Sequence, residues 1–270
     1  MMLLGQIAAW SMLAFGALLF VCQLLSYEGG FLIGRRQAKQ REGPGESIGV
    51  LIGGLLGLLA FVLALTLSFA SERFNERRAG TLAEANAIGT AWLRAKAIGE
   101  PNGDEVARLL EQYIKLRISF VQTGHDTPEL DEINRRTDAL QSEIWGHVSA
   151  IVRERPNPIS ASLMTSVNEV FDMTTAARFS FELRLPPPIF WMLLGLTVLG
   201  MGVVGYQLGL RERRIRMLGA VLALSWAVVI VTILDLAAPR IGNLRTSVAA
   251  YQWTAQSFEG EIKVPPKPQQ

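Results

Sequence analysis

The chain has 270 residues, half of them hydrophobic, and its 26 basic and 24 acidic side chains leave a net charge of +2. This near balance gives no reason to expect a nucleic-acid partner. A single cysteine, Cys22, excludes an intramolecular disulfide and a cysteine-based metal site. The apolar residues form four blocks with the charges between them, which argues against an ordinary soluble enzyme, a disordered chain and a disulfide scaffold.

Each apolar block is long enough to cross a bilayer as a helix, because a hydrocarbon core about 30 Å thick needs roughly 20 apolar residues. The blocks occupy about 3–25, 48–70, 189–210 and 217–238. The first block has no basic start or cleavage site and is too long for a signal peptide, so it is expected to be a retained helix. The sequence therefore predicts an all-α integral membrane protein with four transmembrane helices in two pairs.

The predicted organisation follows from these blocks. Residues 1–70 hold the first transmembrane pair, 71–188 a helical extramembrane bundle continuous with the second span, 189–240 the second pair, and 241–270 a C-terminal tail with a disordered end. The chain should bind the lipid bilayer, and no nucleic acid.

Helix signals divide the middle segment. No strong breaker follows the second block until 99–103, so that helix should leave the bilayer and run for about 50 residues, or roughly 75 Å. Asn102 or Gly103 is expected to cap the next helix, Thr127-Pro128 starts another, and Pro156-Asn157-Pro158 separates the last two. Each stretch has one apolar stripe and one charged face, which is typical of helices packed together.

The charges of the short loops bear on orientation. The loops 27–46 and 211–216 each carry four basic residues. Short basic loops tend to stay on the cytoplasmic side, which predicts that both termini and the middle segment lie outside.

Glycine spacing indicates where helices approach closely. Gly53 and Gly57, like Gly205 and Gly209, have the four-residue spacing that favours helix packing in membranes. The run from Gly200 to Gly205 is a literal G-x-G-x-x-G, but it lies inside a predicted span, where the backbone N–H groups are already bonded and cannot hold a phosphate.

A few charged residues lie in or near the spans. Asp235, near the end of the fourth block, is a functional candidate, with a structural pairing to Arg240 or a neighbouring helix as the alternative. Arg73, Glu76 and Arg78 follow the second block and either pair locally or line a vestibule.

The chain offers no convincing catalytic or metal-binding set. The two histidines, His125 and His147, are not accompanied by ligands at the usual spacing, so we expect no metal, no cofactor and no enzyme activity. A membrane enzyme is the least favoured interpretation.

The second block carries the sharpest pattern. Gly57, Phe61, Leu65 and Phe69 recur every four residues along one helix face. If copies of this helix surrounded an axis, the stripe would form an apolar constriction that gates ions by dewetting. A lipid-facing stripe or a packing stripe is the alternative.

The run from Leu63 to Arg94, with four spans split two and two around a long helical middle, resembles the bestrophin family, and more closely its uncharacterised bacterial bestrophin-like branch. The motif residues are Glu72-Arg73-Phe74-Asn75-Glu76 and Arg78, then Glu84-Ala85-Asn86-Ala87-Ile88-Gly89-Thr90-Ala91 and Leu93-Arg94, and later Asp235, Pro239 and Gly242.

The resemblance implies a homo-oligomeric, pentameric anion channel in the bacterial inner membrane, with the second spans lining its pore and the middle segment in the cytosol. Neck positions would fall at Gly57, Phe61 and Leu65, with Phe69 one turn on. A glycine at the first position departs from a bulky gate, and no acidic calcium-binding run is present. The alternative function is a non-conducting membrane scaffold or sensor whose helical bundle binds a partner.

Overall fold

The computed structural model describes residues 12–39, 47–99, 101–124, 127–183, 185–240 and 244–260. All regular secondary structure in these ranges is α-helical, which confirms the predicted all-α class. The chain divides into two compact units, and the long helix α3 (Ser47–Ile98) contributes to both. The first unit comprises Met1–Phe74 and Arg184–Leu244, and the second comprises Asn75–Leu183 and Arg245–Gln270.

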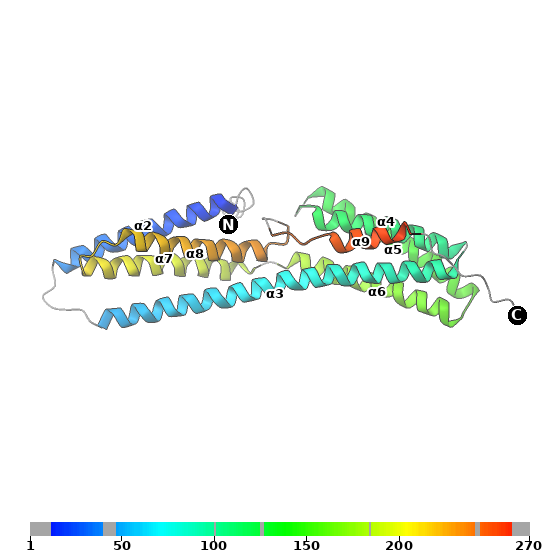
Figure 1. The fold of residues 1–270 in the computed structure, drawn as a ribbon, viewed down its shortest axis with the longest axis horizontal. Coiled ribbons are helices and arrows are strands. Elements are labelled where there is room, and N and C mark those ends of the chain that lie inside the picture. Colours follow the sequence, from blue (N-terminus) through cyan, green and yellow to red (C-terminus); the bar gives the residue numbers. More distant parts are fainter. Residues whose placement is uncertain are drawn as a thin grey trace. The chain divides into compact units, whose positions relative to one another are not determined.

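The first unit holds the membrane-spanning helices. Beside the first part of α3, it contains α2 (Met12–Ala38), α7 (Pro187–Leu210) and α8 (Arg216–Ala237), and α2 runs alongside α7 and α8 (Figure 1). Four helices of the described chain are long and apolar enough to cross a membrane. The protein is therefore an integral membrane protein, as predicted.

The end of the first span differs from the sequence prediction. α2 does not stop near Leu25 but continues to Ala38, so the predicted loop 27–46 is helical over its first part. The helix continues because Tyr27, Phe31 and Gly34 are buried at spacings of four and three residues. The predicted start of this span, residues 3–11, lies outside the described residues.

The other spans begin and end close to their predicted bounds. α3 extends from Ser47 through the second span and out to Ile98, confirming a helix of about 50 residues. α7 starts inside the triple proline. Proline has no backbone N–H, but the N–H groups of the first helical turn have no partner within the helix, so nothing is lost. α8 ends at Ala237, before Pro239.

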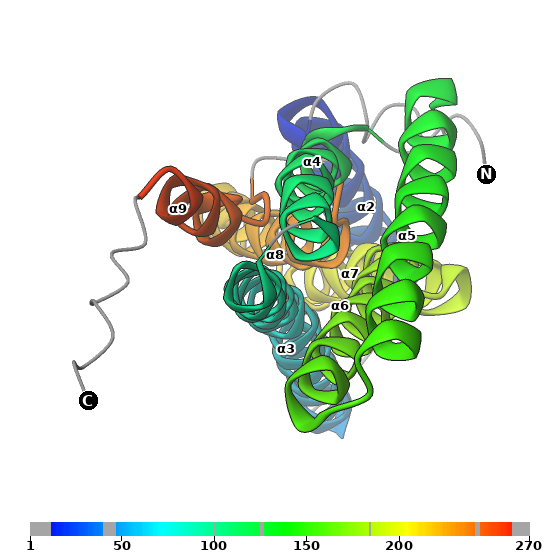
Figure 2. The same ribbon diagram turned by 90° about the vertical axis from the view of Figure 1, so that its right-hand side faces the viewer.

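The second unit is a bundle of five helical segments. The last part of α3 packs with α4 (Asn102–Gln122), α5 (Pro128–Glu154), α6 (Pro158–Glu182) and α9 (Ala249–Phe258). Within it α4 lies between α5 and α9 (Figure 2). Their apolar stripes meet in one buried core.

The residues that mark the starts of α5 and α6 in the sequence cap these helices in the structure. The Thr127 hydroxyl accepts the N–H of Leu130 at 3.2 Å, and Asn157 forms a capping box with Ser160. The predicted cap of α4 is wrong, because Asn102 and Gly103 lie inside the helix and the preceding Pro101 makes no side-chain cap. The side chain of Asn102 instead lies beside His147.

The helix α9 lies in the region for which the sequence predicted only a tail. Its last residue, Phe258, stacks on Trp92 of α3 with ring centroids 4.7 Å apart. Its Tyr251 is fully buried. Of the predicted disordered end, 260–270, all but Gly260 lies outside the described residues.

Candidate functional site

The membrane-spanning part of α3 has one packed face and one exposed face. Leu59 and Leu63 are buried in a core that also contains residues of α2, α7 and α8. On the other side Phe61, Leu65 and Phe69 are 60%, 42% and 63% exposed. The stripe that the sequence singles out therefore lies on the face that α3 does not use within its own chain.

Small residues on this exposed face leave space beside the helix. A Cβ atom added at Gly53, Gly54 or Gly57 would meet nothing within 4 Å. Ala60 and Ala64 are exposed on the same helix. Because side chains are absent or limited to a methyl group at these positions, the backbone of α3 is accessible to close approach by another molecule.

The exposed face of α8 is built differently. Its exposed residues Val221, Leu224 and Val228 are bulky and aliphatic. Such side chains suit contact with lipid tails, since they fill the space around the backbone. The exposed glycines and alanines thus distinguish α3 from its neighbour in the same unit.

The glycines of α7 have a different environment from those of α3. An added Cβ at Gly205 would lie 2.0 Å from the carbonyl oxygen of Tyr27, and one at Gly209 would lie 2.3 Å from that of Phe31. Both contacts are to the backbone of α2. The two helices can approach this closely only because glycine has no side chain.

The G-x-G-x-x-G run of residues 200–205 lies wholly within α7. Gly200 packs against Leu59 and Trp226, and Gly202 lies against Ser26. These glycines serve contacts between helices.

The three charged residues proposed for a vestibule lie on α3 beyond its apolar part. Arg73 belongs to the first unit, whereas Glu76 and Arg78 belong to the second. All three side chains are exposed and each makes an interaction within the chain. The adjacent Arg77 is buried, so neighbouring arginines of this run have different environments.

Asp235 is buried near the end of α8. Its Oδ1 accepts the backbone N–H of Leu244 at 3.3 Å. This contact links Leu244 to the end of α8, so the carboxylate has a structural role there. Arg240, its predicted partner, is also buried.

The surroundings of His147 differ from the sequence prediction. Glu105 of α4 and Glu143 of α5 lie close enough to His147 for all three side chains to share a metal ion, whereas the sequence suggested no such companions. The Glu105 carboxylate already accepts a hydrogen bond from Arg108 Nε at 2.9 Å, which lowers its pKa. Arg108 is thus a cation that already neutralises this group. His125 lies outside the described residues.

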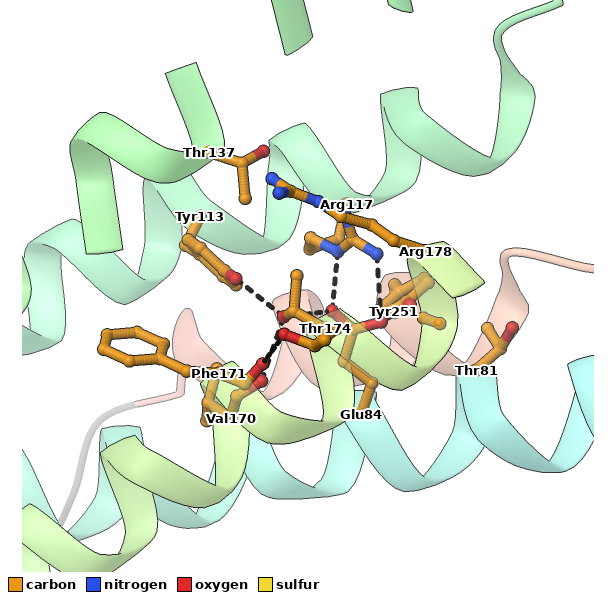
Figure 3. Close-up of polar contacts among 12 residues, drawn as sticks. Thr81, Glu84, Tyr113, Arg117, Thr137, Val170, Phe171, Thr174, Arg178 and Tyr251 are labelled. Carbon is orange, nitrogen blue, oxygen red and sulfur yellow. Dashed lines mark hydrogen bonds and ion pairs between the residues drawn. The ribbon is translucent and has the colours of Figure 1, made fainter. Parts of the chain in front are cut away.

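A buried ion pair in the second unit was not found from the sequence. Arg117 of α4 and Glu84 of α3 are both fully buried, with Arg117 Nε 2.6 Å from Glu84 Oε1 (Figure 3). The guanidinium also lies 4.2 Å from the ring centre of Phe120. Burial works to lower the pKa of Arg117, but the neighbouring acidic groups, Glu84 first, raise it overall.

Three hydroxyl groups complete the network around Glu84. Tyr251 of α9 donates to Glu84 Oε2 at 2.5 Å, and Thr174 of α6 donates to Oε1 at 2.8 Å. Tyr113 lies 2.7 Å from the Thr174 hydroxyl (Figure 3). The network therefore joins α3, α4, α6 and α9 through one carboxylate.

Burial sets the protonation of the two tyrosines. It raises the pKa of Tyr251 well above the ordinary 10.0, and the charge of Glu84 adds to the shift. Burial also raises the pKa of Tyr113. Both phenols therefore stay neutral and remain hydrogen-bond donors at physiological pH.

The fold and these surfaces define an all-helical integral membrane protein whose long α3 joins a membrane unit to a helical bundle. Residues 20–251 match the family model described as the Bestrophin-like domain. The chain belongs to the bestrophin-like family, as the motifs after the second span predicted. No curated protein and no solved structure matches it.

Proposed function

We propose that the protein forms a homo-oligomeric anion channel, a pentamer as the family resemblance implies, in which the exposed faces of α3 from several copies surround the pore. Membership of the bestrophin-like family supports an anion channel. The carrying observation is the exposed face of α3, with its open glycines at Gly53 and Gly57 beside exposed aromatic side chains. We place the assembly in the bacterial inner membrane, as the family resemblance implies.

Within this channel Phe61, Leu65 and Phe69 form the apolar constriction. Large apolar side chains around a narrow axis expel water, and an ion then crosses only when the constriction widens. Gly57 lacks a side chain and so does not narrow the pore; its role is close approach between copies of α3.

The charged residues after the span act as the vestibule. Arg73 and Arg78 attract anions toward the pore, and Glu76 moderates this field. Positive charge at a channel mouth raises the local concentration of anions, an effect that weakens as ionic strength rises. Anion flux should therefore depend on salt more steeply in the wild type than in Arg73→Gln/Arg78→Gln.

Chloride flux from liposomes containing the purified full chain tests the proposal. Phe61→Ala and Leu65→Ala should raise flux, because smaller side chains hold water more readily in the constriction. Leu224→Ala and Val228→Ala on the exposed face of α8 are matched controls that remove similar apolar surface away from the pore. Absence of flux, or equal changes in flux for the α3 variants and the α8 controls, would overturn the channel proposal.

The non-conducting scaffold or sensor remains the competing function. This hypothesis predicts no anion flux and no assembly of copies through α3. Native mass spectrometry of the detergent-solubilised chain separates the two, since a monomer leaves no central axis around which α3 could form a pore.

A further inference from the structure

One end of the first unit gathers basic residues from two separate chain segments. We call it the basic end; it comprises Arg35, Arg36 and Lys39 from the end of α2, and Arg211, Arg213, Arg214 and Arg216 from the turn between α7 and α8. With the two acidic residues Glu28 and Glu212, the net charge of these nine side chains is +5. This surface has no part in the pore proposed above.

Close helix packing brings the two segments together. An added Cβ at Gly34 would lie 3.0 Å from the backbone nitrogen of Leu210, and one at Gly209 would lie 2.9 Å from that of Arg35. The next residue after Leu210 is Arg211. The backbone positions that carry the basic residues of α2 and of the turn therefore lie close together.

The turn after α7 has a defined shape. The N–H of Arg213 bonds to the carbonyl of Leu208 at 3.1 Å, and that of Glu212 to Gly209 at 3.1 Å, which is the pattern of a Schellman motif. Glu212 has a positive φ of 50°, the conformation that this motif requires. The turn therefore holds Arg211 and Arg213 in fixed backbone positions.

Two of the arginines share the carboxylate of Glu28. Glu28 of α2 accepts hydrogen bonds from Arg214 at 2.8 Å and Arg216 at 2.9 Å, and Arg214 also lies 5.3 Å from the ring centre of Phe31. The other five basic residues are exposed, and within the described part of the chain none has a carboxylate partner. The unneutralised charge is therefore available to an external anion.

Exposed apolar residues adjoin this charge. Leu32 and Ile33 on α2, and Ile215, Met217 and Leu218 around the start of α8, are all exposed. Because α2 and α7 end here and α8 begins here, this surface lies where three membrane-spanning helices leave the hydrocarbon. It thus offers cations at the headgroup level and aliphatic surface directly beside them.

We propose that the basic end binds the phosphate headgroups of anionic phospholipids, with Arg35 and Arg36 of α2 and Arg211 and Arg213 of the turn holding the phosphates. Arginine binds phosphate oxygens in a bidentate manner, and clusters of four to eight basic residues beside a span attract anionic lipids. The adjoining apolar side chains contact the acyl chains. A free phosphate ion would gain nothing from that apolar surface, which is why a lipid is the occupant.

The test uses the purified full chain in neutral-detergent micelles with equal amounts of phosphatidylglycerol and phosphatidylcholine. Native mass spectrometry measures the ratio of the two lipids bound. Each basic residue near an anionic surface contributes a factor of roughly five in binding. The variant R35Q/R36Q/R211Q/R213Q should therefore lower the phosphatidylglycerol preference by about tenfold or more, after allowance for salt screening.

A matched control removes as much charge from the second unit. K115Q/R136Q/R153Q/R155Q changes four exposed basic residues outside the membrane spans and should keep the wild-type preference. An equal ratio in both quadruple variants and wild type would overturn the proposal. If the first variant does not fold, R35Q/R36Q and R211Q/R213Q are measured separately, and each should lose part of the preference; two unchanged ratios would again overturn it.

Inorganic phosphate distinguishes the lipid from a free anion. Phosphate at the same concentration should leave the bound phosphatidylglycerol in place, because it lacks the acyl chains. Displacement of the lipid by phosphate alone would show an anion site of another kind and would reject the lipid as its occupant.

Discussion

Two glycine pairs with the same spacing have opposite surroundings in the first unit. Gly205 and Gly209 of α7 lie directly against the backbone of α2, whereas Gly53 and Gly57 of α3 face open space. The first pair therefore supports packing inside one chain, and the second leaves a surface that nothing in the chain fills. The four-residue spacing of glycines indicates only that another helix can approach closely. Which helix does so depends on the fold.

The largest effect should come from filling the packed glycine. Gly205→Ala places a methyl group 2.0 Å from the Tyr27 carbonyl oxygen, and the backbone cannot move aside cheaply. Overpacking usually costs about 1–3 kcal/mol, and contact with backbone should raise this to roughly 4 kcal/mol or prevent folding. Denaturant unfolding in detergent measures the change.

Gly29→Ala is the matched control for this comparison. Gly29 lies on α2, one residue from the closely packed Gly30, yet an added Cβ there meets nothing within 4 Å. Its unfolding free energy should change by no more than about 1 kcal/mol, in the stabilising direction. Similar losses in both variants would mean that the close approach of α2 and α7 is not what glycine provides.

The second unit should respond most to loss of its buried charge pair. Glu84→Gln leaves Arg117 buried without an opposite charge, which costs about 3 kcal/mol or more. Glu154→Gln, at an exposed carboxylate on α5, should change stability by less than about 0.5 kcal/mol. The double variant Glu84→Gln/Arg117→Met should recover part of the loss, because no unpaired charge remains. A double variant as unstable as the single one would contradict this account.

Tyr251→Phe should have a smaller effect on the same network. It removes the hydroxyl that donates to Glu84 but leaves the ion pair and the ring in place, so a loss of about 1–2 kcal/mol is expected. Because Tyr251 is one of the residues through which α9 contacts the bundle, protease digestion at the C-terminal end should also accelerate. An unchanged digestion rate together with unchanged stability would mean that Tyr251 does not hold α9.

Alkaline pH tests the protonation of the same residue. The pKa of Tyr251 is raised in the folded protein, so the folded state retains a proton that the unfolded chain loses above pH 10.0. This contribution to stability is complete below pH 10.0 and is lost as the pH rises toward the folded-state pKa. Tyr251→Phe should therefore show a shallower fall in stability above pH 10.0 than wild type. Equal slopes would show that another group causes the alkaline loss.

Local signals in the sequence account for most of the fold. Long apolar blocks predict α3, α7 and α8, since few other structures use about 20 apolar residues in succession. Thr127-Pro128 and Asn157-Pro158 mark the starts of α5 and α6 because capping acts within a few residues. The end of α2 was not predicted because the apolar block ends near residue 25 and the basic stretch 27–46 was interpreted as a loop, whereas contact with α7 continues the helix.

The buried network around Glu84 could not be predicted from the sequence for a different reason. Glu84 lies in the motif that suggested the family, but its partners Arg117 and Tyr251 are 33 and 167 residues away along the chain. Charged residues are usually exposed, so a single sequence gives no signal that these will meet in a core. The short helix α9 depends on the same distant contact. Conversely, Phe61 and Leu65 were identified by periodicity, while their exposure depends on which face of α3 packs within the chain.

Apart from the control variants, the smallest change in stability should come from Gly57, and this substitution separates folding from assembly. Gly57→Ala adds a methyl group in open space and improves helix propensity, so the unfolding free energy of a single chain should rise by up to about 1 kcal/mol. If copies of α3 approach one another at this face, the same methyl group weakens the oligomer, and Gly57→Leu weakens it further. Native mass spectrometry at equal protein concentration compares these variants with Val228→Leu, which enlarges the exposed face of α8 instead. A decrease in oligomer for the Gly57 variants alone assigns the open glycines to contact between chains; an unchanged oligomer in all of them assigns that face to lipid and removes α3 from the pore.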